Sequence, residues 1–295
     1  MKLYVEKHDA YAGRWIYDGY KSAWQFLNYD VEKANLRTHV PSEQQYDIMT
    51  TDSAINDGNL DVLAKARRVY LFVQPTSFPM PWGRHPNFVS SCTPRNIEIL
   101  NNMENVYKWT FTKVTDFHKD WKNVKNIPLA YDSINYRPII DKKYEFDVCY
   151  IGGWADNGFD EKRKILQDYL SELKDLNLKY GIFINKGLSH EQENKVLANS
   201  KIAINIHDAY QQQLGLDTNE RTFKSLGLTG FLISDYVKCM NDLLPEVPLA
   251  NNATDMKDLV LEFLSKDLSE IKQKNRTYIL QNHTYIERAK YLESL

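Results

Sequence analysis

Short apolar runs the length of a β-strand alternate along this chain with longer segments of helical periodicity. In the second half, strand-like runs at 146–151, 180–184, 202–206 and 231–234 are separated by helical patterns at 160–176, 190–199 and 221–226. Each helix carries the chain back, so that successive strands can pair in parallel. The alternation therefore predicts an α/β fold built on doubly wound parallel sheets.

The first half repeats this alternation less regularly. Strands are predicted at 2–6, 46–50 and 69–73, with helices at 15–27 and 60–68. A loop with three prolines, 76–86, follows. The pattern is interrupted near 138–145, where Pro138 precedes a stretch rich in Lys and Asp. We therefore expect two Rossmann-like domains, 1–140 and 141–295.

Two such domains have a consequence for ligand binding. Open parallel sheets bind ligands at the carboxyl ends of their strands. If the two sheets face each other, a cleft forms in which one domain holds a donor and the other an acceptor. Such an arrangement suits a transfer between a donor and an acceptor.

Composition and charge exclude several classes of protein. Hydrophobic residues make up 43% of the 295 residues and charged residues 26%, which is a globular composition and not a disordered one. The formal net charge is −2. A chain without a basic excess lacks the electrostatic footprint of a nucleic-acid-binding protein, so nucleic acid is not an expected partner.

The cysteines and the N-terminus bear on compartment and metals. Cys92, Cys149 and Cys239 are odd in number and widely spaced, with no zinc-ligand pattern. The N-terminus becomes charged at once, unlike a signal peptide, and no run approaches 18 apolar residues. The expectation is a cytoplasmic protein in a reducing compartment, without a transmembrane segment, a structural metal or a bound cofactor.

The segment 217–235 carries the strongest chemical signal. Thr218 or Asn219 is a suitable N-cap for the helix that follows. The free N–H groups and dipole of a helix N-terminus favour a diphosphate, and Arg221 adds a guanidinium fork in the first turn. Gly227 and Gly230 allow a tight return into the next strand. The alternative is an ordinary helix–turn–strand unit with a surface arginine.

Three segments of the chain together resemble one known family. The run Asn219-Glu-Arg-Thr-Phe223, continuing to Gly230-Phe-Leu-Ile-Ser-Asp235, is similar to the donor-site segment of GT-B glycosyltransferases of the spore-maturation CgeB-like group, which have a C-terminal domain like that of the group 1 glycosyl transferases. The segments 127–132 with 146–153, and 282–288, resemble the same family at the expected distances. The resemblance covers about 127–292, while the first 125 residues show only the general α/β pattern. It implies that 141–295 binds the donor and that 1–140 is the acceptor-side domain.

This resemblance implies a function. GT-B enzymes transfer a sugar from a nucleoside-diphosphate sugar, most often UDP-linked, to a hydroxyl acceptor, and they usually need no metal. The acceptor could be a glycan, a protein, a lipid-linked sugar or a small molecule. The donor is then a co-substrate and no separate cofactor is expected.

Further residues are predicted to bind the donor. Gly152 and Gly153 end a strand, where glycine lets backbone amides approach a phosphate. Arg163 resembles the basic residue that many GT-B enzymes direct at the diphosphate, although a solvated helix-face arginine is the alternative. Asn185 and His207 follow neighbouring strands at the ligand end of the sheet; a structural histidine is the alternative for His207.

One position departs from the family. The glutamate that usually follows the arginine by three residues is replaced by Lys224, which cannot accept hydrogen bonds from sugar hydroxyls. Either Glu220 or another acceptor takes that role, or Lys224 contacts phosphate or an anionic sugar, or the site is non-catalytic.

The predicted acceptor domain offers several polar residues after its strands. His8 and Asp9 follow the first strand and Asp52 the second. A carboxylate or imidazole near an acceptor hydroxyl could act as general base, and we rank Asp52 and His8 first. In the proline-rich loop, Trp82 and His85 form a candidate acceptor-stacking pair. Ordinary loop positions are the alternative for each.

Three other functions remain open from sequence. A DNA-base glucosyltransferase of the phage kind shares the fold, although the acidic charge balance disfavours phosphate contacts. A nucleotide-sugar-binding module without transfer would agree with Lys224. A sugar epimerase on the same two-domain framework would convert a donor without an acceptor.

Overall fold

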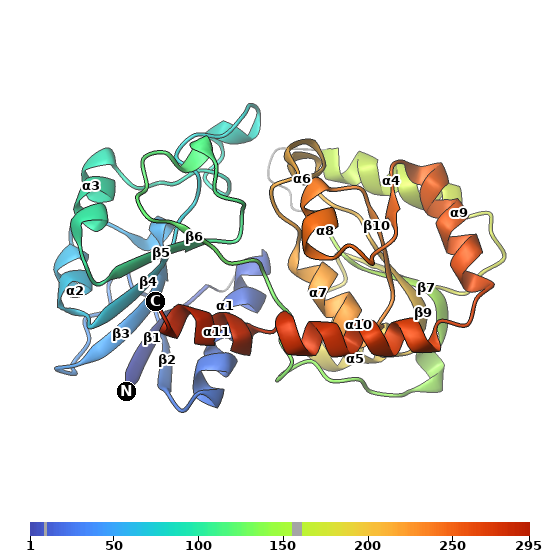
Figure 1. The fold of residues 1–295 in the computed structure, drawn as a ribbon, viewed down its shortest axis with the longest axis horizontal. Coiled ribbons are helices and arrows are strands. Elements are labelled where there is room, and N and C mark those ends of the chain that lie inside the picture. Colours follow the sequence, from blue (N-terminus) through green and yellow to red (C-terminus); the bar gives the residue numbers. More distant parts are fainter. Residues whose placement is uncertain (9–10, 155–160) are drawn as a thin grey trace. The chain divides into compact units, whose positions relative to one another are not determined.

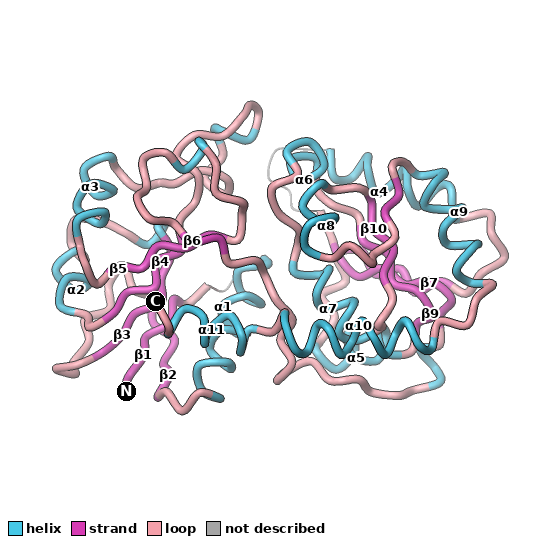
Figure 2. Tube along the Cα trace, in the orientation of Figure 1, coloured by secondary structure: helices cyan, strands magenta, loops and turns pink. Residues whose placement is uncertain are grey.

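The computed structural model describes residues 1–8, 11–154 and 161–295. The chain divides into two compact units. Unit 1 comprises Met1–Pro128 together with Ile286–Leu295, and unit 2 is Leu129–Tyr285. Each unit is built around its own parallel sheet (Figures 1 and 2).

The sheet of unit 1 has the strand order β2-β1-β3-β4-β5-β6, and every pairing is parallel. The elements are β1 (Lys2–Glu6), α1 (Tyr11–Phe26), β2 (Asp30–Ala34), β3 (Tyr46–Thr51), α2 (Leu60–Lys65), β4 (Arg68–Phe72), α3 (Pro94–Asn102), β5 (Val106–Thr110), β6 (Lys125–Asn126), α11 (Tyr285–Glu293) and the short 3₁₀ helices Asp52–Ala54, Trp82–Arg84 and Asp116–His118.

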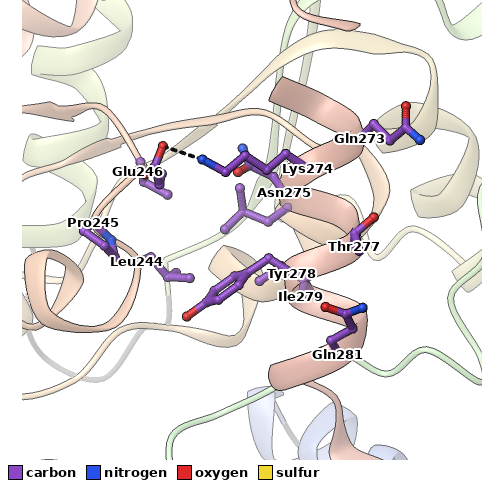
Figure 3. Close-up of a pocket in the computed structure, with 12 residues that line it drawn as sticks. Leu244, Pro245, Glu246, Gln273, Lys274, Asn275, Thr277, Tyr278, Ile279 and Gln281 are labelled. Atoms are coloured by element: carbon purple, nitrogen blue, oxygen red, sulfur yellow. Dashed lines mark ion pairs between the residues drawn. The ribbon is translucent and has the colours of Figure 1, made fainter. Parts of the chain in front are cut away.

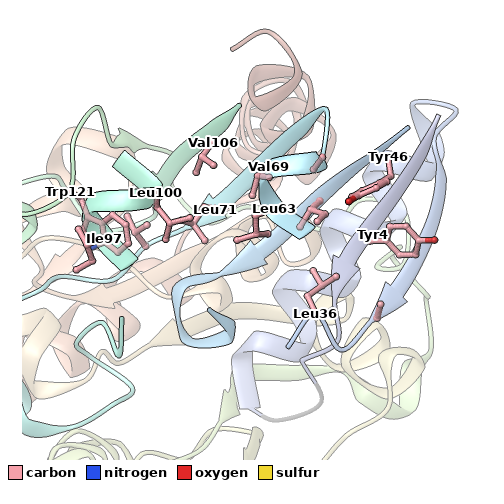
Figure 4. Packing of buried hydrophobic residues seen from close by; sticks show 14 residues of the cluster. Tyr4, Leu36, Tyr46, Leu63, Val69, Leu71, Ile97, Leu100, Val106 and Trp121 are labelled. Atoms are coloured by element: carbon pink, nitrogen blue, oxygen red, sulfur yellow. The ribbon is translucent and has the colours of Figure 1, made fainter. Parts of the chain in front are cut away.

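Helices cover both faces of this sheet. On one face, Ile48, Val69 and Leu71 from the central strands form a core with Leu63 of α2 and Leu100 of α3 (Figure 4). On the other face the packing is aromatic. Tyr20 of α1 meets Trp109 edge to face at 5.3 Å between ring centroids, and Trp24 stacks on Tyr70 at the same distance. Strands buried on both faces read as continuous apolar runs, as the sequence of β4 does.

The sheet of unit 2 has the order β11-β10-β9-β7-β8, again parallel throughout. Its elements are the 3₁₀ helix Lys142–Tyr144, β7 (Phe146–Gly152), α4 (Glu161–Leu173), β8 (Tyr180–Ile184), α5 (His190–Ala198), β9 (Ser200–Asn205), α6 (Ala209–Leu214), α7 (Glu220–Leu228), β10 (Leu232–Asp235), α8 (Lys238–Leu243), β11 (Leu249–Ala250), α9 (Ala253–Leu264) and α10 (Ser269–Asn282).

The two faces of this sheet are also covered by different helices. Ile204 and Ile233 pack in one core with Leu166 of α4 and with Met256 and Val260 of α9. Helices α5 and α7 pack against each other and against β9, and α10 packs on α7. The central strands β7, β9 and β10 therefore place their carboxyl ends together at one edge of a doubly wound sheet.

The predicted α/β class and doubly wound parallel sheets are confirmed. The sequence analysis missed β2, β5, β6, β11, α3, α6 and α8. β2 is a partly exposed edge strand, and its charged residues do not form the apolar run that predicts a strand. β5 contains the buried Lys108, whose ammonium bonds the carbonyls of Leu100 and Val106. For α3 a signal existed, because Thr93 caps the helix and Pro94 occupies its first turn.

The units divide at a different place from the predicted boundary between 140 and 141. The division falls after Pro128, and residues 286–295 rejoin unit 1. Contacts within unit 1 explain this return. The Tyr29 hydroxyl donates to Glu293 at 2.6 Å, Arg68 donates to the carbonyl of Glu293 at 2.6 Å, and Arg288 donates to the carbonyl of Pro128 at 2.8 Å.

Among the described residues, no helix is both long enough and apolar enough to traverse a bilayer.

Candidate functional site

The carboxyl edge of the unit 2 sheet brings three predicted features together. β7 ends in Gly152, followed by Gly153; β9 ends at Asn205; and α7 begins after its N-cap Asn219. Side chains from all three segments meet at one place, and Arg221 in the first turn of α7 is at its centre.

The Arg221 guanidinium is held in a fixed position. Its Nη1 donates to Oδ1 of Asn205 at 2.8 Å and to the carbonyl of Ile206 at 3.3 Å. The guanidinium carbon lies over the ring of Tyr150, 4.9 Å from the centroid. A β-carbon built on Gly152 would lie only 2.6 Å from Nη2 of Arg221. A larger residue at 152 would therefore displace this arginine from its position, which the sequence alone did not reveal.

The second glycine meets a different side chain. A β-carbon on Gly153 would lie 2.1 Å from Oδ1 of Asn185. The Asn185 backbone N–H donates to the carbonyl of Gly152 at 2.9 Å, and the residue has a φ of 54°, in the left-handed region that asparagine tolerates. Asn185 is thus beside the glycine pair, as the sequence predicted from its place after β8.

Helix α7 begins where the sequence predicted. The Asn219 side chain accepts from the N–H of Thr222 at 3.2 Å and donates to Asn205 at 3.2 Å. The cap therefore also links the helix start to the end of β9. A capped helix N-terminus directs its remaining N–H groups and positive dipole end towards one point, which is a suitable environment for an anion.

Lys162 is a second cation at this edge that the sequence reasoning did not select. Its side chain is buried, and its ammonium bonds the carbonyl of Ile206, which also accepts from Arg221. Asp208 lies 3.2 Å from the same ammonium. Lys162, in the first turn of α4, is buried, whereas the nearby Lys164 is exposed. The sequence could not distinguish the two lysines, because it does not show which face of α4 packs on the sheet.

His207 is close to the site but is enclosed. The ring is fully buried, with Nδ1 2.6 Å from Oδ1 of Asp235 and Nε2 2.7 Å from the Thr218 hydroxyl. Burial alone would raise the pKa of Asp235, but the adjacent His207 charge and the hydrogen bonds from His207 and Gln212 outweigh it and hold the pKa below its ordinary value. Both ring nitrogens are engaged, so the predicted direct donor contact is revised: the pair orders the loop before α7.

Lys224 points into the protein and not towards a ligand. Its ammonium lies 2.7 Å from Glu193 of α5 and 3.6 Å from Glu220, one turn earlier on α7. Burial raises the pKa of Glu220 although Lys224 opposes the shift. For Lys224, burial lowers the pKa, but Glu220 and Glu193 together raise it above the ordinary value. The substitution of the family's glutamate is thus explained by a buried ion-pair cluster, and Lys224 is not available to phosphate.

Arg163 lies on the exposed face of α4. Its guanidinium carbon is 5.8 Å from the ring centroid of Trp154, which follows the glycine pair. The sequence pointed to Arg163 as the phosphate ligand of this helix, whereas the structure places the neighbouring Lys162 at the edge of the sheet.

In unit 1, Asp52 is at the carboxyl end of β3, as predicted, but it is buried. Its Oδ2 accepts from the backbone N–H of Gln74 at 2.9 Å. Burial raises the pKa of the carboxyl, opposed by hydrogen bonds from Gln74 and Ser90. With no exposed surface, Asp52 ties β3 to the end of β4, so the carboxyl that was predicted as a general base is enclosed in this conformation.

The carboxyl end of β1, the strand that pairs with β3, carries two further titratable groups. The ring of His8 is partly exposed and stacks on Tyr17 at 6.0 Å between centroids. Glu6, which sequence reasoning missed, accepts from the Thr50 hydroxyl at 3.0 Å, and burial raises its pKa from 4.5 to about 7. Asp9, the other candidate here, lies outside the described residues.

The proposed acceptor pair separates into a buried and an open member. Trp82 is buried within the loop and therefore cannot stack on an acceptor in this conformation. His85 is partly exposed, contacts Phe88 edge to face at 5.7 Å, and accepts from the N–H of Asn87 at 3.2 Å. The prediction for Trp82 is revised because its ring contributes to the packing of the loop.

A separate pocket of about 510 Å³ lies in unit 2 between α10 and the segment that follows α8 (Figure 3). Tyr278 and Ile279 of α10 line one side and Leu244 and Pro245 the other. An ion pair of 3.2 Å joins Lys274 and Glu246 beside it. Its lining includes none of the residues that contact Arg221, so it is distinct from the glycine–arginine site.

The described residues contain no group of three or more His, Cys, Asp or Glu side chains placed to hold a metal ion.

The two doubly wound parallel units together have the GT-B fold, and the second unit carries an arginine and a helix N-terminus at the carboxyl edge of its sheet. Residues 137–294 match the family model described as glycosyl transferase-like. The match spans more than half of the chain, so the protein belongs to this family. The resemblance drawn from the sequence is thereby confirmed, while none of the curated proteins matches the chain in sequence.

Several solved structures share the fold of this chain. Phage T4 BGT in complex with UDP-glucose is 11% identical, with a TM-score of 0.59 over 100% of this chain and 98% of that one. A glycosyltransferase involved in avilamycin A biosynthesis is 10% identical, with a TM-score of 0.54 over 99% and 96%. An α-glucosyltransferase in complex with UDP and DNA is 11% identical, with a TM-score of 0.55 over 96% and 95%. These likenesses establish the fold.

Proposed function

We propose that the protein transfers a sugar from a nucleoside-diphosphate sugar, UDP-linked, to a hydroxyl of its acceptor. One observation carries this proposal: the Arg221 guanidinium is fixed against Gly152 by Asn205 and Tyr150. A guanidinium, the buried ammonium of Lys162 and a helix N-terminus converge there, and all three favour a diphosphate. The choice of uridine is supported by two proteins of the same fold, which were solved with UDP-glucose or UDP.

The chemistry follows from the position of these cations. The acceptor oxygen attacks the anomeric carbon, the bond from that carbon to the diphosphate oxygen breaks, and the acceptor proton passes to a base. Negative charge then grows on the departing diphosphate, where Arg221, Lys162 and the α7 N–H groups stabilise it. In this proposal the fixed cations perform that task without a divalent ion, so full activity in EDTA is expected.

The base belongs to unit 1 in this proposal. His8 is partly exposed at the end of β1, whereas Asp52 is buried, so His8 takes the acceptor proton and Asp52 positions the loop. His8→Ala should lower kcat about a hundredfold or more, which is the usual contribution of a general base, with UDP affinity unchanged. An unchanged kcat would assign the proton transfer elsewhere.

The donor site is tested by calorimetric titration of UDP into the wild type and into Arg221→Ala. The variant should lose about a hundredfold in affinity, because hydrogen bonds to charged groups contribute ~1.5–3 kcal/mol each. Its melting temperature should remain close to that of the wild type, since Arg221 is only half buried. Arg95→Ala, which removes an exposed arginine of α3 in unit 1, is the control for charge.

Incubation of the wild type with UDP-sugars separates transfer from binding. Release of UDP from UDP-sugars, with or without an acceptor, indicates an enzyme; tight binding with no turnover indicates a binding module. A large loss of stability in Arg221→Ala with affinity unchanged would contradict the assigned site. Interconversion of the donor sugar without UDP release would indicate an epimerase.

DNA is the second candidate acceptor, because two enzymes with this fold are described as acting on or binding DNA. A net charge of −2 disfavours it, since each phosphate contact needs a cation. Gel retardation by duplex DNA, weakening steeply with salt, would favour DNA; retardation absent at low salt favours another acceptor.

A further inference from the structure

The hydroxyl of Tyr150 is a buried polar group without a partner at the edge of the unit 2 sheet. Tyr150 is in β7, two residues before Gly152, and its side chain is 1% exposed. Within the described residues its hydroxyl makes no hydrogen bond. A buried hydroxyl left unpaired destabilises a protein by about 1–3 kcal/mol. A hydrogen-bond partner for the Tyr150 hydroxyl would remove this cost.

The open hydroxyl faces the same point as Arg221. A β-carbon built on Gly152 would lie 2.8 Å from the Tyr150 hydroxyl oxygen and 2.6 Å from Nη2 of Arg221. Residues two apart on a strand project to the same side, so the Tyr150 hydroxyl and Nη2 of Arg221 both lie against Gly152 on the side where a side chain would project. Glycine permits this close approach, and the two polar groups meet there.

The two groups define the chemistry of what can enter. Nη1 of Arg221 is occupied by Asn205 and the carbonyl of Ile206, whereas Nη2 has no hydrogen-bond partner within the described residues. A guanidinium nitrogen can only donate, and a tyrosine hydroxyl can donate as well. An atom that satisfies both must therefore be an acceptor, and beside a fixed cation an anionic oxygen is favoured.

We propose that the Tyr150 hydroxyl and Nη2 of Arg221 donate to one phosphoryl oxygen of the donor diphosphate. This rests on the proposed function and deepens it by naming a binding residue that is neither an arginine nor a glycine. The ring of Tyr150 packs against one face of the Arg221 guanidinium and holds it in place. The Tyr150 hydroxyl then provides the second hydrogen bond to the phosphoryl oxygen. A fixed donor aimed at the leaving group strengthens as charge develops there, so Tyr150 contributes to kcat as well as to affinity.

The test is Tyr150→Phe, which retains the ring beneath Arg221 and removes only the hydroxyl. UDP should bind about ten- to a hundredfold more weakly, as expected for one hydrogen bond to a charged group. Uridine, which has no phosphate, should bind as it does to the wild type. The melting temperature should be equal or higher, because an unpaired buried hydroxyl has been removed.

Tyr180→Phe is the matched control. Tyr180 begins β8 in the same sheet, and its hydroxyl bonds the carbonyl of Leu173, so its loss should affect stability and leave UDP affinity unchanged. Equal UDP affinity in Tyr150→Phe and the wild type overturns the inference alone. An equal loss for UDP and uridine also overturns it, because the effect would then not come from phosphate. Failure of the wild type to bind UDP contradicts the proposed function, and the inference with it.

Discussion

The most direct predictions concern single side chains at the carboxyl ends of the strands. Glu6 is buried at the end of β1, and burial raises its pKa from 4.5 to about 7, although the Thr50 hydroxyl, the Leu36 N–H and Arg37 oppose the shift. Below pH 4.5 the folded and unfolded carboxyls are both protonated, so no penalty exists. Between the two values the folded state binds more protons, so the stability contributed by this group falls as pH rises.

Glu6→Gln removes that penalty. The free energy of unfolding of the variant, relative to the wild type, should rise between pH 4.5 and pH 8 by at most about 3 kcal/mol, since one pKa unit corresponds to ~1.4 kcal/mol. Urea titrations at four pH values measure this difference. Glu104→Gln, at an exposed position before β5, is the control, and a difference that is flat with pH for Glu6→Gln would show that this carboxyl does not titrate as described.

Gly152 separates the stability of the fold from the function of the site. Gly152→Ala places a methyl group 2.6 Å from Nη2 of Arg221 and 2.8 Å from the Tyr150 hydroxyl. The displaced atoms are at side-chain ends and not in the backbone, so the melting temperature should change little. Affinity for UDP should nevertheless fall by at least about tenfold, the equivalent of one hydrogen bond.

Gly153→Ala is the neighbouring comparison. Its methyl group meets only the exposed Asn185 side chain, which can rotate away. Its affinity for UDP should therefore fall less than that of Gly152→Ala. If the two variants bound UDP equally well, the close approach of Arg221 to Gly152 would have no part in the donor site.

At the residue scale, the sequence predicted which residues lie at the ends of strands and helices, but not which distant side chains pack against them. Asn219 as N-cap and Gly152 at a strand end follow from local rules about helices and turns. Whether a polar side chain faces solvent or core depends on the packing of distant segments. For this reason Asp52, Trp82 and His207 were predicted as ligand contacts although their side chains are buried. Tyr150 was missed although it is two residues from a selected glycine.

At the scale of elements, the packing of α7 on α5 depends on a buried ion pair. Lys224 of α7 bonds Glu193 of α5 at 2.7 Å, with both side chains less than one-tenth exposed. Lys224→Met leaves Glu193 buried without its partner, which should destabilise unit 2 by about 3–5 kcal/mol. Replacing both residues, Lys224→Met with Glu193→Leu, should recover much of that loss, because neither uncompensated charge of the pair remains.

A double-mutant cycle by chemical denaturation measures the coupling. The i,i+4 pair Lys195–Glu191 on α5, with an exposed Glu191 and a partly exposed Lys195, serves as the comparison, and its cycle should show little coupling. If Lys224→Met were as stable as the wild type but bound UDP poorly, Lys224 would be a donor ligand after all. The sequence could identify the substitution of a glutamate, but the partner that explains it lies 31 positions earlier in the chain.

The elements themselves were predictable where both faces are buried. β4, β7, β9 and β10 read as apolar runs because helices cover the sheet on each side. The edge strands β2 and β11 carry no such pattern, since one side of an edge strand has no neighbour in the sheet. Helix α7 was placed to within two residues because its cap, its arginine and its terminal glycines are all local signals.

At the scale of the whole chain, the last helix belongs to the first unit, which a contiguous division of the sequence could not express. Leu292 of α11 is fully buried within unit 1, and the preceding Tyr291 is 46% exposed. Leu292→Ala should therefore destabilise unit 1 by about 2–5 kcal/mol, the usual effect of removing a buried leucine side chain. Tyr291→Ala should have little effect and is the matched control.

Hydrogen exchange followed by mass spectrometry distinguishes the two divisions of the chain. If 286–295 completes unit 1, Leu292→Ala should accelerate exchange in β1, β3 and β4 and leave β7 and β9 protected, because local stability follows the cooperative unit that loses contacts. If the C-terminal helix instead belonged with 141–295, protection would fall in β7 and β9. The donor site should remain intact in the first case, so UDP should still raise the stability of unit 2 in the variant by mass action.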